Sequence, residues 1–323
     1  MIKNNSDFLF LFDATNCNPN GDPDQENVPR MDNETKTLLV SDVRRKRDVR
    51  DFLVNKGYDI FVRTLNDTKV TMDDMFDEIM KKYNIKDDAP SKEKVDKIID
   101  NMIDMRIFGS AMAVKGLKKT KKKGKKDDSD SSENEDNSGA YSFTGPVQIT
   151  WGYSLHPVDI IRSNTIVTIM NDVNATFGKM YKVHYALVAH SGTVNKFAAA
   201  KTRMTENDKD IFSRALVQSM MNNLTHSKQG QQPLLYLEIV YNEDFDGYLG
   251  DLRRFIRTET LKENAVRSID DLNVDFQELT SAVNDLKSKG YIKDIYIWKD
   301  QYTKKFENLP DARELDLLKP IIK

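Results

Sequence analysis

The chain has almost no cysteine and no long apolar run. Cys17 is the only cysteine among 323 residues, which excludes a disulfide within the chain and a zinc site built from several cysteines. No apolar stretch approaches the roughly 18 residues that a membrane span needs. The N-terminus also lacks the basic, apolar and small-residue order of a signal peptide. We therefore expect a soluble cytoplasmic protein without a membrane partner.

The chain also lacks an excess of either charge. It carries 49 Lys and Arg residues against 51 Asp and Glu residues. The overall charge therefore gives no support for nucleic-acid binding, and such a site has to come from local segregation of charge. Apolar residues make up 39% of the chain, which is enough to bury a real core in one large domain or two.

Recognisable catalytic and cofactor motifs are missing as well. The sequence contains no P-loop and no GxGxxG, and none of its four histidines has a zinc-site spacing. No nucleophile is accompanied by an identifiable base. We therefore expect no enzymatic activity and neither a cofactor nor a metal.

The most informative segment is Phe8–Phe12, in which five apolar residues follow one another without interruption. Such a run predicts a strand that is buried on both faces. It leads into Asn18-Pro-Asn-Gly-Asp-Pro23, whose residue types set or tolerate turn dihedrals. A helix from Ser41 to Asn55 is then expected, with Ser41 as its N-cap. A strand, a polar loop and a cationic helix in this order suit the binding of an anion.

The charges of that helix support two interpretations. From Ser41 to Phe52 there are five basic residues against three acids, a small excess. Two i,i+4 pairs, Arg44 with Asp48 and Arg47 with Asp51, predict a solvated face whose charges neutralise each other. In the other interpretation, the less neutralised Lys46 and Arg50 bind phosphates, and backbone amides of the loop add donors.

Three aspartates near the loop, Asp13, Asp22 and Asp24, offer an alternative chemistry. Carboxylates on a loop that follows a strand often converge on a metal ion. A turn of the Asx type explains Asp22 and Asp24 equally well, and no helical carboxylate partner is identifiable.

The remaining pattern predicts an α+β fold with a large insertion. Two helices separated by Pro90 are expected between Thr71 and Met105. The block at about 115–140, rich in lysine and then in acids, has almost nothing to bury and is expected to be disordered. Period-two alternation from Tyr141 to Trp151 predicts a half-buried strand with Trp151 on its apolar face.

Without the insertion, the elements follow the order strand, helix, strand, strand, helix, strand. The second helix begins at Thr205, with Asp208 at the capping-box position. This is the βαββαβ ferredoxin-like order, an α+β sheet covered by helices on one face. We expect residues 1–65 and 141–323 to form this domain and residues 66–140 to form the inserted helical region. The aromatic octamer of an ordinary RNA-recognition motif is absent.

Five motifs in chain order resemble the CRISPR-associated Cas seven family, and most closely its Csh/Csd group of type I-B and I-C Cascade. These motifs are Phe12-Asp-Ala-Thr-Asn-Cys-Asn-Pro-Asn-Gly-Asp-Pro-Asp24, Val28-Pro-Arg-Met-Asp32, the helix from Ser41 to Arg50, Met105-Arg-Ile-Phe-Gly-Ser-Ala-Met112 and Thr144-Gly-Pro-Val-Gln-Ile-Thr-Trp-Gly-Tyr-Ser154.

The resemblance implies a noncatalytic backbone subunit of a type I interference complex. Such subunits polymerise along a guide RNA (crRNA) and present it to the target DNA strand, together with other Cascade subunits. They are shaped like a hand, with a ferredoxin-like (RRM-like) palm, inserted fingers and a thumb, here at about 159–181. Relatives carry an aromatic residue at the working edge of the thumb, where this chain has aliphatic and hydroxyl side chains. The candidate RNA-binding residues are Asn20, Arg30, Ser41, Lys46, Arg47, Arg50, Met112, Val167 and Thr168.

Two other functions remain open from the sequence. Type III relatives of this fold cut target RNA with an aspartate in the loop after the first strand, so Asp13, Asp22 or Asp24 is a candidate for a Mg²⁺-dependent endonuclease. A monomeric binder of single-stranded RNA is the second alternative, and it predicts no RNA-dependent filament.

Overall fold

A computed structural model describes residues 1–65, 68–114, 117, 139–166, 178–222, 225–261 and 265–323. Its described part is a mixture of helices and strands, as predicted, and is organised around a ten-stranded sheet. The strands of this sheet are β1 (Ser6–Cys17), β4 (Met31–Asp32), β5 (Thr37–Val40), β8 (Val147–Ile149), β9 (Gly152–Ser154), β10 (Ile160–Ile166), β11 (Gly178–Val194), β12 (Gln231–Tyr241), β15 (Ile292–Lys299) and β17 (Arg313–Glu314).

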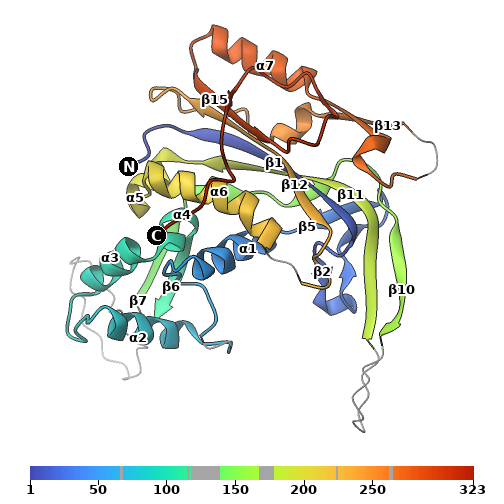
Figure 1. The fold of residues 1–323 in the computed structure, drawn as a ribbon. Coiled ribbons are helices and arrows are strands. Elements are labelled where there is room, and N and C mark those ends of the chain that lie inside the picture. Colours follow the sequence, from blue (N-terminus) through green and yellow to red (C-terminus); the bar gives the residue numbers. More distant parts are fainter. Residues whose placement is uncertain (66–67, 115–116, 118–138, 167–177, 223–224, 262–264) are drawn as a thin grey trace, which may run out of the picture.

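The other elements lie around this sheet (Figure 1). The helices are α1 (Asp42–Asn55), α2 (Met72–Lys82), α3 (Ser91–Asn101), α4 (Ile103–Phe108), α5 (Lys196–Thr202), α6 (Glu206–Asn222) and α7 (Gln277–Ser288), with short 3-10 helices η1 (Pro23–Gln25), η2 (Leu252–Phe255) and η3 (Ile269–Asp271). The small sheets contain β2 (Gly21–Asp22), β3 (Val28–Pro29), β6 (Gly109–Val114), β7 (Gly139–Thr144), β13 (Arg257–Thr260), β14 (Leu272–Asp275) and β16 (Phe306–Glu307). No helix in the described ranges is long and apolar enough to cross a membrane.

Strand β1 lies in the middle of the large sheet, whose main order is β17-β15-β12-β1-β11-β9-β5-β4. It pairs antiparallel with β11 on one side and with β12 on the other. Phe8, Phe10 and Phe12 are buried in one hydrophobic cluster, whereas Leu9 and Leu11 are buried in another. The prediction of a strand buried on both faces is therefore confirmed.

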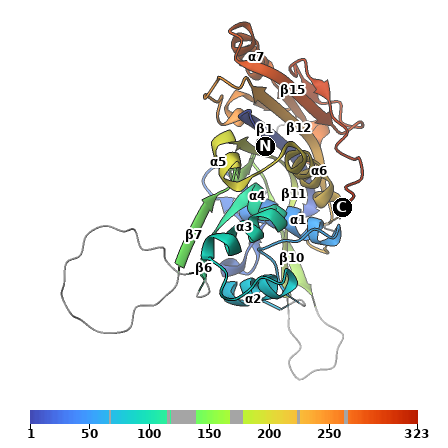
Figure 2. The same cartoon turned by 90° about the vertical axis from the view of Figure 1, so that its left-hand side faces the viewer.

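The two faces of the sheet have different covers. Helices α1 and α6 contact each other and pack over the phenylalanine face. The expectation that helices cover one face only is wrong, because Leu279 and Val283 of α7 share a cluster with Leu9 and Leu11. Figures 1 and 2 show α7 and α6 on opposite sides of the sheet. A strand that is apolar on both faces requires a cover on each of them.

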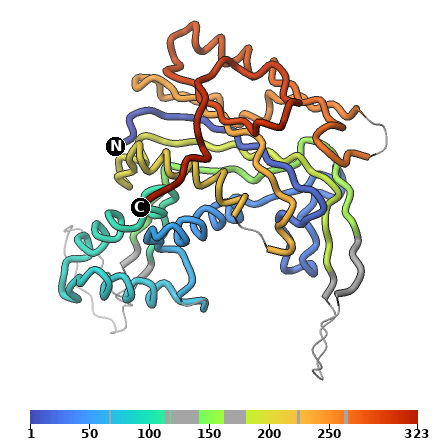
Figure 3. Tube along the Cα trace, viewed as in Figure 1, coloured from blue at the N-terminus to red at the C-terminus, as the bar shows by residue number. Residues whose placement is uncertain are grey.

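The C-terminal segment ties these two covers together. In Figure 3 it runs, in dark red, from the α7 side of the sheet back to the α6 side. The side-chain amide of Gln218 on α6 donates to the carbonyl oxygens of Leu317 (2.7 Å) and Lys319 (2.8 Å). Ile321 is buried in the same cluster as the phenylalanine face of β1.

A third hydrophobic cluster lies within the inserted region. It contains the apolar faces of α2 and α3 together with Met105 and Met112. Helix α3 begins directly after Pro90, so the predicted pair of helices with a proline between them is confirmed. The ion pair between Arg106 and Asp208, at 2.8 Å, joins this region to α6. Most of the block at 115–140 lies outside the described residues, so the structure does not test the prediction that this block is disordered.

The strand expected from Tyr141 to Trp151 differs from the prediction. It is divided into β7 and β8, and the side chain of Trp151 is 46% exposed. Ile149 pairs with Gly192 and Tyr153 pairs with Ala189. Four steps along this segment therefore correspond to three along β11. One extra residue reverses the alternation of the side chains, which places Trp151 outside instead of on the apolar face.

Candidate nucleic-acid interface

The polar loop after β1 is fixed to the start of α1 by Asn20. The side-chain oxygen of Asn20 accepts hydrogen bonds from the backbone N–H of Ser41 (3.0 Å) and from its hydroxyl (2.9 Å). The Ser41 hydroxyl oxygen in turn accepts from the backbone N–H of Arg44 at 3.3 Å, which confirms Ser41 as the N-cap. Asn20 is 8% exposed. Asn20 and Ser41 thus form a rigid wall beside the helix.

The cations of α1 are all engaged within the described chain. The two predicted pairs are confirmed, with Arg44 bound to Asp48 and Arg47 bound to Asp51. Further pairs join Lys46 to Asp42 at 2.9 Å, Arg45 to Asp48 at 2.8 Å and Arg50 to Asp104 at 3.1 Å. The premise that Lys46 and Arg50 are less neutralised than their neighbours is therefore wrong.

The sequence could predict one of these additional ion pairs but not the pair between Arg50 and Asp104. Asp42 lies four residues before Lys46, so helical spacing was a sufficient signal for that pair. Asp104 is 54 positions from Arg50, and only the fold brings them together. The Arg50 side chain is 12% exposed, and its guanidinium lies 5.0 Å from the centre of the Phe108 ring. Arg50 therefore mainly stabilises the packing of α1 against α4.

A pocket of about 260 Å³ lies beside the exposed face of α1. Its walls combine guanidinium groups with apolar side chains: Val43, Arg47, Arg50, Asp51, Val62, Arg63 and Thr64. The Arg47 side chain is 64% exposed. Arg63, which belongs to no motif of the sequence, makes no ion pair with any residue in the described ranges. The guanidinium groups of Arg47 and Arg63 are thus the accessible cations of the pocket. They lie next to the exposed side chains of Val43 and Val62.

Arg30 and the loop aspartates form a separate small structure. Arg30 pairs with Asp22 at 3.2 Å, and a carboxylate oxygen of Asp22 accepts from the backbone N–H of Asp24, also at 3.2 Å. This is the turn geometry that was one of the two predictions for Asp22 and Asp24. In the part of the chain that the structure describes, no group of three or more His, Cys, Asp and Glu residues is placed to hold a metal ion.

The remaining candidate residues do not join the α1 surface. Met112 is fully buried in the cluster of the inserted region, so its side chain has no free surface with which to bind RNA as predicted. Val167 and Thr168 lie outside the described residues. The arms of their hairpin are described, and Ile160 pairs with Val183 where β10 runs antiparallel to β11.

Asp13 has the ionisation behaviour of a buried group. Burial, with a smaller contribution in the same direction from the nearby charge of Asp300, raises the pKa of its carboxyl to about 7. The same carboxyl in an unfolded chain has a pKa of 3.8. Between these two values the folded protein binds a proton that the unfolded chain does not, so the fold loses stability as the pH rises.

We predict that Asp13→Asn removes part of this pH dependence. The free energy of unfolding of the unmodified protein is expected to fall by about 1–3 kcal/mol between about pH 5 and pH 8 through this group. Urea unfolding at both pH values measures the effect. Asp7 has a pKa raised to about 6 by burial and contributes in the same direction in both proteins. Equal pH slopes for the two proteins would show that Asp13 is not the titrating group.

Comparisons with known proteins point to one family. The family model described as CRISPR-associated protein Cas7 matches residues 4–277. A relative from Haloferax volcanii, described as CRISPR-associated protein Cas7, is 28% identical over 288 residues, which are 87% of this chain and 83% of the relative.

Solved structures resemble the chain over nearly its whole length. A chain of a "CRISPR RNA-guided surveillance complex, pre-nicking" has a TM-score of 0.52 at 14% identity, and 97% of each chain is covered. A chain of a "CRISPR RNA-guided surveillance complex" has a TM-score of 0.48 at 12% identity, with 97% of this chain and 94% of that chain covered. The first of these likenesses indicates a shared fold.

Proposed function

The chain belongs to the CRISPR-associated protein Cas7 family, and we propose that it is a noncatalytic, crRNA-binding backbone subunit of a CRISPR surveillance complex. The match of the family model over residues 4–277 carries this proposal. We further propose that the complex is a type I Cascade, in which copies of this chain and other subunits hold the guide RNA for pairing with a target DNA strand.

The arrangement of the elements supports a hand-like division of labour. The sheet order β12-β1-β11-β9 corresponds to strands four, one, three and two of a ferredoxin-like fold, and we assign it as the palm. We assign the α2, α3 and β6–β7 region as the fingers and the β10–β11 hairpin as the thumb. In Figures 1 and 2, α2 and the described part of this hairpin project on the same side of the sheet, and in Figure 1 α1 lies between them.

The surface of α1 suits binding that ignores the base sequence. A protein that accepts any guide has to grip the RNA backbone and leave the bases free to pair. Arg63 has no competing ion pair in the described chain. The exposed pair of Arg47 with Asp51 contributes little to stability, so a phosphate can replace the carboxylate at small cost. We therefore assign Arg47 and Arg63 as phosphate contacts, with Lys46 as a third and Asn20 and Ser41 as the wall that positions them.

Replacing Arg47 and Arg63 together by glutamine is expected to weaken RNA binding at least about tenfold and to reduce its salt dependence. Each phosphate contact with a single strand releases about 0.7 of a counterion, so the slope of log K against log salt should fall by about 1.4. Binding of a single-stranded RNA at several salt concentrations measures both quantities.

Arg257→Gln is the matched control for this variant. Arg257 is also an exposed arginine paired with a carboxylate, that of Glu278 at 2.7 Å, and it belongs to the cover on the other face of the sheet. Its replacement should leave affinity and salt slope unchanged. If the double variant behaves like the control, the pocket beside α1 is not part of the RNA site.

The endonuclease alternative is not favoured by the geometry of the aspartates. Asp22 and Asp24 share a turn with Arg30, whereas Asp13 lies within β1. Incubation of the purified assembly with complementary RNA and Mg²⁺ tests this alternative directly. Regular cleavage that disappears in an Asp13→Ala variant would overturn the noncatalytic assignment.

A further inference from the structure

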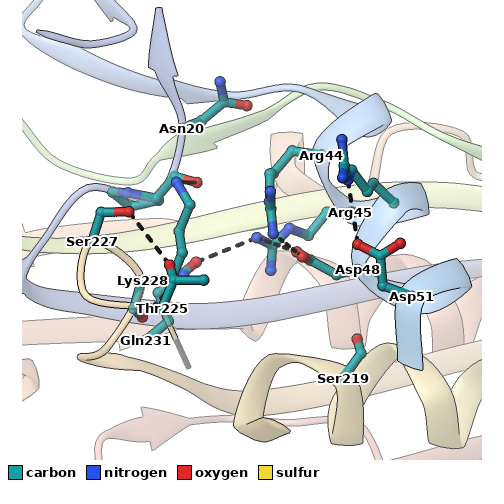
Figure 4. Close-up of polar contacts among 12 residues, drawn as sticks. Asn20, Arg44, Arg45, Asp48, Asp51, Ser219, Thr225, Ser227, Lys228 and Gln231 are labelled. Carbon is teal, nitrogen blue, oxygen red and sulfur yellow. Dashed lines mark hydrogen bonds and ion pairs between the residues drawn. The ribbon is translucent and has the colours of Figure 1, made fainter. Parts of the chain in front are cut away.

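A group of cations lies where α1 meets the loop that joins α6 to β12. Arg44 and Arg45 bind the carboxylate of Asp48, and Lys228 lies on the other side of Arg45, close enough for the charges of these groups to influence it (Figure 4). We refer to these four residues as the junction cluster. One oxygen of Asp48 is bound by Arg44, and the other is 2.8 Å from the guanidinium of Arg45. The two guanidinium groups therefore divide the only carboxylate of the cluster between them.

Lys228 enters this cluster without a carboxylate of its own. Its ammonium donates to the carbonyl oxygens of Asn18 at 2.6 Å and Pro19 at 2.9 Å. These carbonyls belong to the polar loop after β1, and no salt bridge joins Lys228 to an acid within the described residues. Burial, followed by the charges of Arg44 and Arg45, lowers the pKa of Lys228 to about 8. The surroundings of this ammonium thus make it easier to deprotonate than that of an ordinary lysine, and it still carries its charge at pH 7.

The junction cluster is short of negative charge and of acceptors. Within the described residues the cluster holds three cations and one carboxylate, an excess of two positive charges. The Nε atoms of Arg44 and Arg45 are buried, and no acceptor for them lies among the residues that the structure describes. Arg45 is 2% exposed and also donates to the side-chain oxygen of Gln231 at 3.3 Å. Buried charge without compensation is costly, so an anion at this place gains more than it would at an ordinary surface.

The position of the cluster connects it to the RNA surface of α1. The loop that receives the Lys228 ammonium is the one that Asn20 fixes to Ser41 at the start of α1. Arg44 is partly exposed and lies on a face of α1 next to the one that carries Arg47. An RNA backbone that binds Arg47 and Arg63 would therefore reach Arg44 by continuing around the surface of the same helix.

We propose that Arg44 and Lys228 together bind a phosphate group of the guide RNA at the junction of α1 with the α6–β12 loop. This contact rests on the proposed function and adds a second wall to the site, supplied by a segment far from α1 in the sequence. A phosphate oxygen accepts from the guanidinium and ammonium donors that carbonyls and Asp48 leave unused. No base edge is needed, which agrees with a grip that ignores sequence.

Binding of the phosphate couples RNA affinity to the protonation of Lys228. The charged or titratable groups around its ammonium are Arg44, Arg45, Asp48 and Cys17. Arginine stays protonated, and burial raises the pKa of the Cys17 thiol to about 12, so Lys228 is the group of this set that loses a proton near pH 8. A bound phosphate stabilises the ammonium, and affinity should fall as the pH rises above the pKa of the free protein.

The test is the affinity for an oligoadenylate RNA at about pH 7.5 and about pH 9, since adenine does not titrate in this range. Linkage to a group with a pKa of about 8 predicts about eightfold weaker binding at the higher pH for the unmodified protein. Lys228→Arg, which keeps its charge, should bind equally at both pH values. Lys228→Met and Arg44→Gln should each bind more weakly at about pH 7.5, with a reduced salt slope.

Lys289→Met serves as the control, because Lys289 lies just after α7 and pairs with Asp285 on the surface. Its pH dependence should equal that of the unmodified protein. If Lys228→Met and Arg44→Gln retain full affinity and salt slope while the unmodified protein binds RNA, the junction cluster is not a phosphate site and the proposed function stands. If these variants bind RNA normally and lose only assembly with a partner protein, the junction cluster is likewise not a phosphate site and the proposed function stands. Failure of the unmodified protein to bind RNA would instead overturn the proposed function.

Discussion

Replacing Gly109 by alanine is expected to lower the free energy of unfolding by about 3–5 kcal/mol. Gly109 has φ +64° and ψ −178°, a backbone conformation that is essentially restricted to glycine. A Cβ at this position would lie 2.1 Å from the carbonyl oxygen of Phe143 and 2.4 Å from the amide nitrogen of Gly145. Both contacts are with backbone atoms, which cannot rotate away.

The consequence of this clash is a separation of β6 from β7. These strands form the hairpin that carries Met112 into the cluster of the inserted region, so the fingers should loosen before the palm does. Urea unfolding followed by near-ultraviolet circular dichroism measures the loss of stability.

Gly290→Ala is the matched control. Gly290 also has a positive φ, +74°, but nothing lies within 4 Å of the Cβ that alanine would add. This change should cost only about 1–2 kcal/mol, the ordinary penalty of a left-handed alanine. Equal losses of stability for the two variants would show that the clash at Gly109 is relieved by a small adjustment.

Asp104→Ala should produce the second large effect, a loss of about 3–5 kcal/mol in the free energy of unfolding. Asp104 is 1% exposed and accepts hydrogen bonds from the backbone N–H groups of Phe61 (2.8 Å) and Val62 (3.1 Å) and from Arg50. Without its carboxylate, the guanidinium of Arg50 is left in a largely buried place without a counterion. The segment that carries Arg63 also loses its anchor, so RNA affinity should fall as well.

A double-mutant cycle isolates the ion pair from the backbone contacts. Arg50→Met removes the cation and keeps a long apolar side chain over Phe108. In the Arg50→Met and Asp104→Ala double variant, the total loss of stability should be smaller than the sum of the single losses by about 1–3 kcal/mol. Strict additivity would mean that the two side chains do not stabilise each other. Unfolding by urea at constant pH provides all four values.

Local signals in the sequence were sufficient for much of the fold. The uninterrupted run Phe8–Phe12 predicted a doubly buried strand, and it forms the middle of the sheet. The helix caps were equally clear, because the Thr205 hydroxyl and the Asp208 carboxylate bond reciprocally to each other's backbone N–H groups, as the capping box requires. In both cases the signal lies within a few residues.

The candidate site depended on contacts that no local pattern contains. Arg50 meets Asp104, and Lys228 meets Asn18, across distances in sequence that only the sheet topology closes. Arg63 carries no motif, and we propose it as a phosphate contact because it lines the pocket beside α1 and makes no ion pair in the described chain. The exposure of Trp151 follows from one extra residue in the pairing with β11, and period-two alternation has no means of showing such a bulge.

We propose that this chain is an RNA-bound backbone subunit, and the most direct test is the native mass of the purified protein together with the size of any RNA extracted from it. We predict assemblies of several copies on RNA, with a mass that rises by whole chains as longer guide RNA is supplied and that falls to that of a single chain after nuclease treatment. A monomer that carries no RNA and stays monomeric when guide RNA is added would contradict this proposal.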